Sequence, residues 1–119
     1  MGWVLVGINE RLRFFKNSPG HYFGEHYDGC FPRNKLERSF MSLLVNVTAD
    51  YEGGDTAFYD SRLPGRRWDN KAVLGRALIF NHHGWSHEGL RVMGGYKYMI
   101  RSDIMYRKVQ EDDLGPYIG

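Results

Sequence analysis

The sequence predicts a single, mainly β domain, and three observations lead to this prediction. Short apolar and aromatic runs alternate with turn residues, and no long segment repeats its apolar residues with the period of a helix. Aromatic residues make up 15% of the chain and glycines number 15, which favours strands joined by tight turns. The 119 residues suffice for one hydrophobic core but not for two. About eight short strands at this spacing are typical of a sandwich, barrel or jelly roll.

The expected strands of the first half are separated by clear turn signals. The chain enters a strand almost at once, within residues 1–6, and a second short strand covers 12–16. Turn composition at 17–20 precedes a third strand at 21–28. A polar, basic loop follows, and the run at 40–48 is the most strand-like stretch of the chain.

The second half follows the same pattern and ends in a long strand. After a glycine-containing turn we expect strands at 56–59 and 77–80, separated by a second basic loop at 61–70. An irregular segment at 81–86 and a further turn lead into a final strand at 96–106. We therefore expect one domain over residues 1–109 and a loosely patterned tail over 110–119.

Charge and cysteine content limit the class of protein without naming a partner. A net charge of +2 is too small to indicate nucleic acid by itself. The single cysteine, Cys30, excludes an internal disulfide and favours a reducing compartment. No apolar run approaches the roughly 20 residues of a membrane span, and the N-terminus lacks the basic region of a signal peptide. These features predict an intracellular, cytoplasmic protein without a membrane partner; they say nothing of its oligomeric state.

One group of residues predicts a metal centre. His26 and Asp28 lie two apart in an expected strand, so their side chains point to the same face. One further histidine from a neighbouring strand completes a set of two imidazoles and one carboxylate, and His82, His83 and His87 all lie in one later segment. Such a set leaves three positions of an octahedral metal open, which suits non-haem Fe(II) better than a closed zinc site.

The order and spacing of several motifs resemble one enzyme family across nearly the whole chain. These motifs are Arg13-Phe14-Phe15, Pro19-Gly20, Phe23 to Gly29, Tyr51 to Phe58, Gly75 to Phe80, His87-Glu88-Gly89 and Gly95 to Tyr106. Together they resemble the catalytic domain of Fe(II)- and 2-oxoglutarate-dependent dioxygenases, in the prolyl 4-hydroxylase-like branch. The resemblance implies a double-stranded β-helix, or jelly roll, with little helix and with the iron near one open end.

The resemblance also implies roles for individual residues. It assigns the iron to His26, Asp28 and His87. Among the competing histidines, we expect His83 to lie near these ligands without binding the metal. It assigns the distal carboxylate of 2-oxoglutarate to Lys97, and a buried carboxylate does need a cation. The branch usually has a tyrosine where this chain has Asn17, whose amide can still donate a hydrogen bond to the co-substrate.

The implied reaction hydroxylates a C–H bond while 2-oxoglutarate and O2 yield succinate and CO2. Ascorbate is the usual reductant in this branch, and a prolyl-type side chain of a protein or peptide is the default substrate. Substrate choice falls to the loops at the open end of the domain. In this chain the two basic loops provide the candidates Arg33, Arg66 and Arg67.

Two other functions stay open. Arg101 and Arg107 resemble the arginine pair of dioxygenases that demethylate nucleic acid, in which an arginine holds the co-substrate. A non-enzymatic jelly-roll module, cupin-like or an inactive dioxygenase relative, is the third alternative, although no ligand or cation is missing here. Family members usually carry helices before the jelly roll, so we also expect either a fragment of a longer protein or a minimal form.

Overall fold

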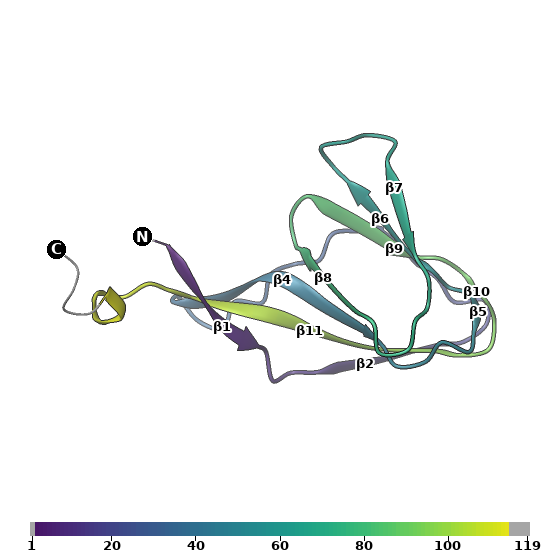
Figure 1. The fold of residues 1–119 in the computed structure, drawn as a ribbon, viewed down its shortest axis with the longest axis horizontal. Helices are drawn as coiled ribbons and strands as arrows, with labels where there is room; N and C mark the ends of the chain where they lie inside the picture. Colours follow the sequence, from purple (N-terminus) through teal and green to yellow (C-terminus); the bar gives the residue numbers. More distant parts are fainter. Residues whose placement is uncertain (1, 115–119) are drawn as a thin grey trace.

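Eleven β-strands and one short 3-10 helix make up the part of the chain that the structure, a computed structural model, describes (Figure 1). That part comprises residues 2–114. The strands form two larger sheets and one separate two-stranded pair.

The larger sheet is built around β11, the longest strand. Its strands are β1 (Trp3–Ile8), β2 (Arg13–Asn17), β4 (Glu37–Asn46), β8 (Ala77–Asn81) and β11 (Lys97–Lys108). They follow the order β1-β11-β4-β8. Strands β1 and β2 both pair with the same edge of β11: β2 with the first half of β11 and β1 with the second half. Because β4 and β11 extend beyond the body of the domain, the molecule is elongated, with extents of 59 × 32 × 22 Å (Figure 1).

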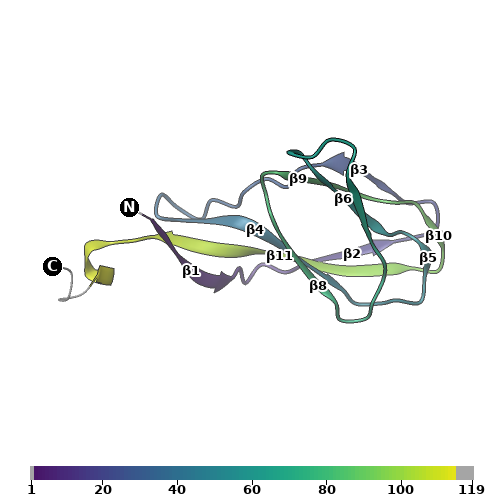
Figure 2. The same ribbon diagram turned by 45° about the horizontal axis from the view of Figure 1, so that its top comes forward.

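A smaller antiparallel sheet faces the first half of β11. It has the order β3-β9-β6-β7 and consists of β3 (Phe23–His26), β6 (Thr56–Asp60), β7 (Arg67–Asn70) and β9 (Trp85–Gly89). The pair β5 (Glu52–Gly53) and β10 (Val92–Gly94) lies at the end where the chain passes between the sheets (Figure 2). Two antiparallel sheets joined by crossing connections form the predicted jelly roll with little helix, which is confirmed.

Part of the buried apolar core lies between these sheets and joins them. Phe58 of β6 and Phe80 of β8 meet edge to face with ring centroids 4.9 Å apart. Ala57, Met99 and Met105 are also buried. Since alternate residues of a strand share a face, Lys97, Met99 and Arg101 of β11 all point toward the smaller sheet. The face of β11 that carries the core residue Met99 therefore also carries the cations Lys97 and Arg101.

Most expected strands are present, but three predictions of irregular structure are wrong. The segment expected to be irregular at 81–86 already enters β9 at Trp85. Residues 67–70 of the second basic loop form the edge strand β7, which pairs with β6. Glu52–Gly53 and Val92–Gly94, in or next to the expected turns, pair with each other as β5 and β10. In each case pairing with a neighbouring strand decides the conformation despite poor strand-forming composition.

The C-terminal tail is described only in part. A 3-10 helix at Glu111–Leu114 falls inside the tail predicted for 110–119, and residues 115–119 lie outside the described part. The domain boundary at 109 stays a prediction. In the described residues, no helix is long and apolar enough to cross a membrane, and the intracellular location stays a prediction.

Candidate functional site

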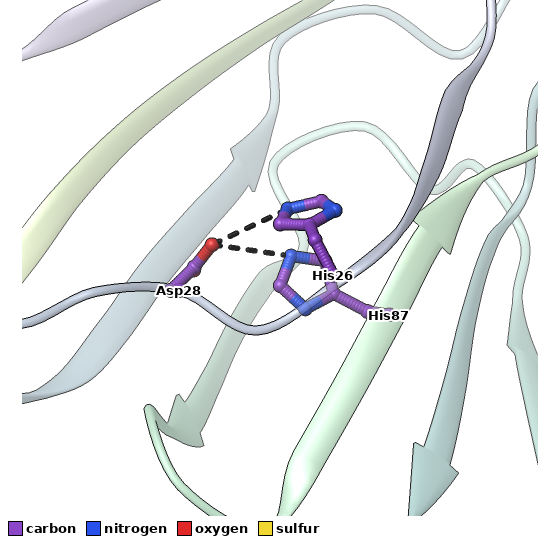
Figure 3. A group of neighbouring side chains, drawn as sticks. All are labelled: His26, Asp28 and His87. Atoms are coloured by element: carbon purple, nitrogen blue, oxygen red, sulfur yellow. Dashed lines mark ion pairs between the residues drawn. The ribbon is translucent and has the colours of Figure 1, made fainter.

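His26, Asp28 and His87 converge on one point between the sheets (Figure 3). His26 ends β3 and is the cross-strand partner of His87 in the middle of β9. Asp28 Oδ1 lies 3.4 Å from Nε2 of each imidazole. The expected strand at 21–28 ends at His26, so Asp28 is not on the strand. The chain that follows β3 nevertheless brings its carboxylate to the two rings.

The two oxygens of the Asp28 carboxylate have different surroundings. Oδ2 accepts a hydrogen bond from the Ser42 hydroxyl at 2.6 Å and lies 3.3 Å from Nη2 of Arg101. Oδ1 faces the imidazoles and has no hydrogen-bond partner, although the side chain is only 1% exposed. A buried, unpartnered carboxylate oxygen is costly unless a cation binds it.

Both imidazoles can present a lone pair to the same point. Nδ1 of His26 lies 2.7 Å from the Gly24 carbonyl and can only donate to it, which leaves Nε2 of a neutral ring as an acceptor. Burial lowers the pKa of His87 to about 4, despite the opposing effect of Asp28, so its ring is neutral at physiological pH. Divalent metals bind imidazole at about 2.1 Å, and adjacent octahedral ligands then lie about 3 Å apart. The three ligand atoms lie within 4.8 Å of one another, so a bound metal would draw them closer together.

Aromatic rings hold the two histidines in place. Phe58 stacks on His87 at a centroid distance of 5.5 Å, and Phe80 meets the same ring edge-on at 4.8 Å. Phe23 contacts His26 at 4.2 Å. Phe58 and Phe80 are buried, so they restrict rotation of the His87 ring and keep water from it, whereas Phe23 and His26 remain accessible to solvent.

A cavity of about 140 Å³ opens beside the triad. Its lining comes from both sheets: Phe15, Asn17, Phe23, His26, Leu44, Thr56, His87, Gly89, Lys97, Met99 and Arg101. Lys97 and Asn17 are cross-strand partners at one end of β11 and β2. Hence the structure places the predicted co-substrate residues in the same cavity as the two histidines.

Lys97 is a buried cation with little compensation. Its side chain is among the buried residues at 3% exposure, and Nζ donates to the Gly54 carbonyl at 2.6 Å. Within residues 2–114, no carboxylate lies within 4 Å of Nζ. Burial lowers the pKa of Lys97 to about 8, and the nearby Asp55 opposes this effect. A buried ammonium without a counter-charge is expected to bind an anion.

The sequence profile of the 2OG-Fe(II) oxygenase superfamily matches residues 12–102, which include the triad and Lys97. The chain belongs to this superfamily. Among curated proteins, no sequence matches significantly.

Solved structures of 2OG-Fe(II) oxygenases share this fold. A prolyl hydroxylase from Trichoplax adhaerens, in complex with a hypoxia inducible factor peptide fragment, has a TM-score of 0.65 and 14% identity. It aligns over 94% of this chain and 49% of its own. A Pseudomonas putida prolyl-4-hydroxylase has a TM-score of 0.63 and 18% identity over 82% of this chain and 52% of its own. The chain therefore spans about half the length of these oxygenases.

The jelly roll is also shared outside the oxygenases. A cupin domain from Bordetella pertussis has a TM-score of 0.50 and 16% identity, and the alignment covers 87% of this chain and 93% of that domain. At this identity the likeness concerns the fold alone.

The arginine pair of the nucleic acid alternative is split in this domain. Arg101 lines the cavity and contacts Asp28, as described above. Arg107 lies six residues further along β11, which corresponds to about 20 Å, and pairs with Asp113. Only Arg101 can therefore act at the site.

Two of the three candidate arginines of the basic loops make surface contacts. Arg33 makes two hydrogen bonds of 2.7 Å to Glu10 and lies 3.5 Å from Glu37. Arg67 belongs to the edge strand β7 and pairs with Asp69 at 2.6 Å. Arg66 is exposed just before that strand. Their role in substrate binding stays a prediction.

Sequence reasoning selected the wrong histidine as the residue around the ligands. His83 is exposed, whereas the adjacent His82 is 1% exposed and contacts the hydroxyls of Ser39 and Ser42. Neighbouring residues at a strand end point to opposite sides, so the strand register decides between the two. Ser42 itself was missed, because a serine in an apolar run carries no signal of contact with Asp28.

Proposed function

We propose that this chain is the catalytic domain of an Fe(II)- and 2-oxoglutarate-dependent dioxygenase that hydroxylates a C–H bond. One observation carries the proposal: the unpartnered Oδ1 of Asp28 faces two imidazoles next to a cavity that contains an uncompensated lysine. The first half of this arrangement needs a cation and the second half needs an anion. Iron and a dicarboxylate satisfy both.

His26, Asp28 and His87 would hold the iron. Two nitrogens and one carboxylate oxygen leave open positions on an octahedral metal, and this donor set suits Fe(II). Bound iron would supply oxygen activation coupled to decarboxylation of 2-oxoglutarate. The protein contributes neutral imidazoles, a fixed carboxylate and the aromatic shield of Phe58 and Phe80.

Lys97 would bind the distal carboxylate of 2-oxoglutarate, with Asn17 donating a further hydrogen bond. Both side chains line the cavity, and Asn17 stands directly across from Lys97 on the neighbouring strand. A bound carboxylate would raise the pKa of Lys97 back toward its ordinary value and so keep the ammonium charged.

A prolyl-type side chain in a protein or peptide is the substrate that we favour. The support is the resemblance to the prolyl 4-hydroxylase-like branch and the peptide in the similar Trichoplax structure. Arg33, Arg66 and Arg67 remain candidates for substrate contacts, and ascorbate is the reductant to include in assays. Demethylation of nucleic acid is the second candidate, supported only by the position of Arg101 in the cavity.

Succinate formation tests this proposal. Purified protein is supplied with Fe(II), 2-oxoglutarate, ascorbate and O2, together with panels of proline-containing peptides, free amino acids and methylated oligonucleotides. We expect Fe(II)-dependent succinate release that one substrate class increases. Lys97→Met should abolish most of it, and Lys35→Met, at an exposed lysine, should not. Absence of succinate with every panel, or equal activity of both variants, would contradict the proposal.

A further inference from the structure

A chain of buried hydrogen bonds runs from Asp28 away from the metal site. Ser42 of β4 donates to Asp28 Oδ2 at 2.6 Å, and its Oγ lies 3.1 Å from Nδ1 of His82. On the other side of the ring, Nε2 of His82 lies 2.7 Å from Oγ of Ser39. The backbone N–H of Phe31 donates to that same Oγ at 2.7 Å. Ser39 and Ser42 are 0% exposed and His82 is 1% exposed, so no water competes for these bonds.

When the His82 ring is neutral, only one arrangement of protons satisfies every group in this series of hydrogen bonds. The single hydroxyl proton of Ser42 goes to the carboxylate of Asp28, so Ser42 Oγ must accept from Nδ1–H of His82. Nε2 of the neutral ring then accepts the hydroxyl proton of Ser39, whose oxygen accepts from the backbone of Phe31.

The surroundings of His82 agree with a neutral ring. Burial lowers its pKa, while the carboxylates of Asp103 and Asp28 act in the opposite direction. Asp103 Oδ1 lies 3.8 Å from Nε2, too far for a hydrogen bond, and its Oδ2 accepts from Arg13 at 2.9 Å. Oδ1 of Asp103 is buried without a hydrogen-bond partner, but it lies beyond hydrogen-bond distance of the ring. The ring nitrogens are therefore left to bridge the two serines.

We propose that Ser42 and His82 are positioning residues that hold Asp28 as a one-oxygen ligand of the metal. Ser42 and Arg101 both bind Oδ2, so Oδ1 alone is turned toward the two imidazoles. His82 fixes the direction of the Ser42 hydroxyl. Its Nδ1–H donates to Ser42 Oγ, and this bond prevents the hydroxyl from rotating away from Asp28.

This arrangement has a consequence for the open metal positions. A carboxylate that bound through both oxygens would occupy one position more and leave too few for a chelating co-substrate and O2. With Oδ2 held by Ser42, two imidazoles and one oxygen leave three positions of an octahedron free. The inference rests on the proposed metal site, and it adds the residues that decide how Asp28 binds there.

Co(II) binding tests the inference without turnover. Affinity is measured by calorimetry under conditions where circular dichroism shows each variant to be folded, and the visible spectrum of Co(II) reports its coordination number. Residues that orient metal ligands typically change affinity about 10–100-fold. We expect Ser42→Ala to weaken binding by that factor and to alter the Co(II) spectrum. Ser61→Ala, at an exposed serine, should do neither.

A matched pair at position 82 separates positioning from mere packing. The amide nitrogen of His82→Asn can take the place of Nδ1 and donate to Ser42, whereas the amide of His82→Gln reaches only the place of Nε2. We expect His82→Asn to bind Co(II) within about threefold of wild type with the same spectrum, and His82→Gln to lose about tenfold. Equal behaviour of this pair, or wild-type affinity in Ser42→Ala, would overturn the inference.

Co(II) binding distinguishes failure of the metal site from failure of the positioning role. If wild type binds Co(II) and Asp28→Ala does not, the metal site stands, and the Ser42 and His82 variants alone decide the positioning role. If wild type binds no Co(II), the proposed metal site and the inference both fall.

Discussion

Asn17 and Lys97 face each other across strands β2 and β11 at the end of a cavity that also reaches both histidines. One residue offers an uncharged donor and the other a buried cation with no carboxylate within 4 Å in the described residues. This pairing defines where an anion would bind.

Removal of the Lys97 charge should abolish tight co-substrate binding. A hydrogen bond to a charged group contributes about 1.5–3 kcal/mol, so Lys97→Met should raise the Kd for 2-oxoglutarate about 10- to 150-fold. Calorimetry with Fe(II)-free protein and with Co(II)-loaded protein measures this change. Unchanged affinity in both forms would show that the anion binds elsewhere.

Burial of Lys97 should also make stability depend on pH in the absence of ligand. The pKa of Lys97 is about 8 in the folded protein against 10.5 when exposed. Between these values the unfolded chain binds more protons than the folded chain, so the contribution of Lys97 to stability rises with pH across this window. The full difference is about 3 kcal/mol. Urea unfolding at several pH values should show this rise in wild type relative to Lys97→Met, and parallel curves would contradict it.

Substitution of Asn17 should change affinity according to charge. Asn17→Leu removes one donor and should weaken 2-oxoglutarate binding by about 10-fold, the low end for one hydrogen bond to a charged group. Asn17→Asp places a carboxylate opposite Lys97 and should weaken binding further, because it competes with the ligand for the ammonium. Calorimetric titration of both variants checks the order, and tighter binding by Asn17→Asp would be incompatible with our assignment.

The two arginines of β11 should respond differently from Lys97. Arg107 pairs with Asp113 far from the cavity, so Arg107→Met should leave the KM for 2-oxoglutarate unchanged. Arg101→Met removes one of the two groups that hold Asp28 Oδ2 and should therefore change metal binding more than co-substrate binding. Steady-state kinetics at varied Fe(II) and 2-oxoglutarate separates the two effects. A larger rise in KM for 2-oxoglutarate in Arg101→Met than in Lys97→Met would favour the nucleic acid demethylase alternative.

Gly53 should be essential for the turn that brings the Gly54 carbonyl to Lys97. Its φ of +67° is rarely adopted by other residues, and a Cβ there would lie 2.6 Å from the Arg91 carbonyl oxygen. Gly53→Ala should therefore cost more than the roughly 1–2 kcal/mol of a left-handed conformation alone. Gly65 has a φ of +83°, and a Cβ there would meet no atom within 4 Å. Gly65→Ala therefore measures the cost of the left-handed conformation without a clash. Denaturant unfolding compares the two variants, and equal losses would contradict a steric role for Gly53.

The residue pattern predicted a β sandwich, barrel or jelly roll together with the group of candidate ligands, and the motif resemblance selected the jelly roll. His26 and Asp28 are close along the chain, so their proximity follows from local geometry even though β3 ends before Asp28. The choice of His87 among three histidines came from resemblance, and cross-strand pairing with His26 now brings it to the site.

Other features depend on register and pairing that composition does not encode. Trp85–Gly89 contains few strand-forming residues and becomes β9 because β3 and β6 pair with it on both sides. The exchange of His82 for His83 is an error of one residue, which reverses the direction of a side chain. Contacts such as Ser42 with Asp28 join residues on different strands, and no local pattern predicts them.

The visible spectrum of the protein with Fe(II) and 2-oxoglutarate under anaerobic conditions is the decisive test of the proposed site. We expect a weak charge-transfer band in wild type that requires both additions. We expect no band in Asp28→Ala. A wild-type protein without the band, or an Asp28→Ala variant that retains it, would contradict the site described by His26, Asp28, His87 and Lys97.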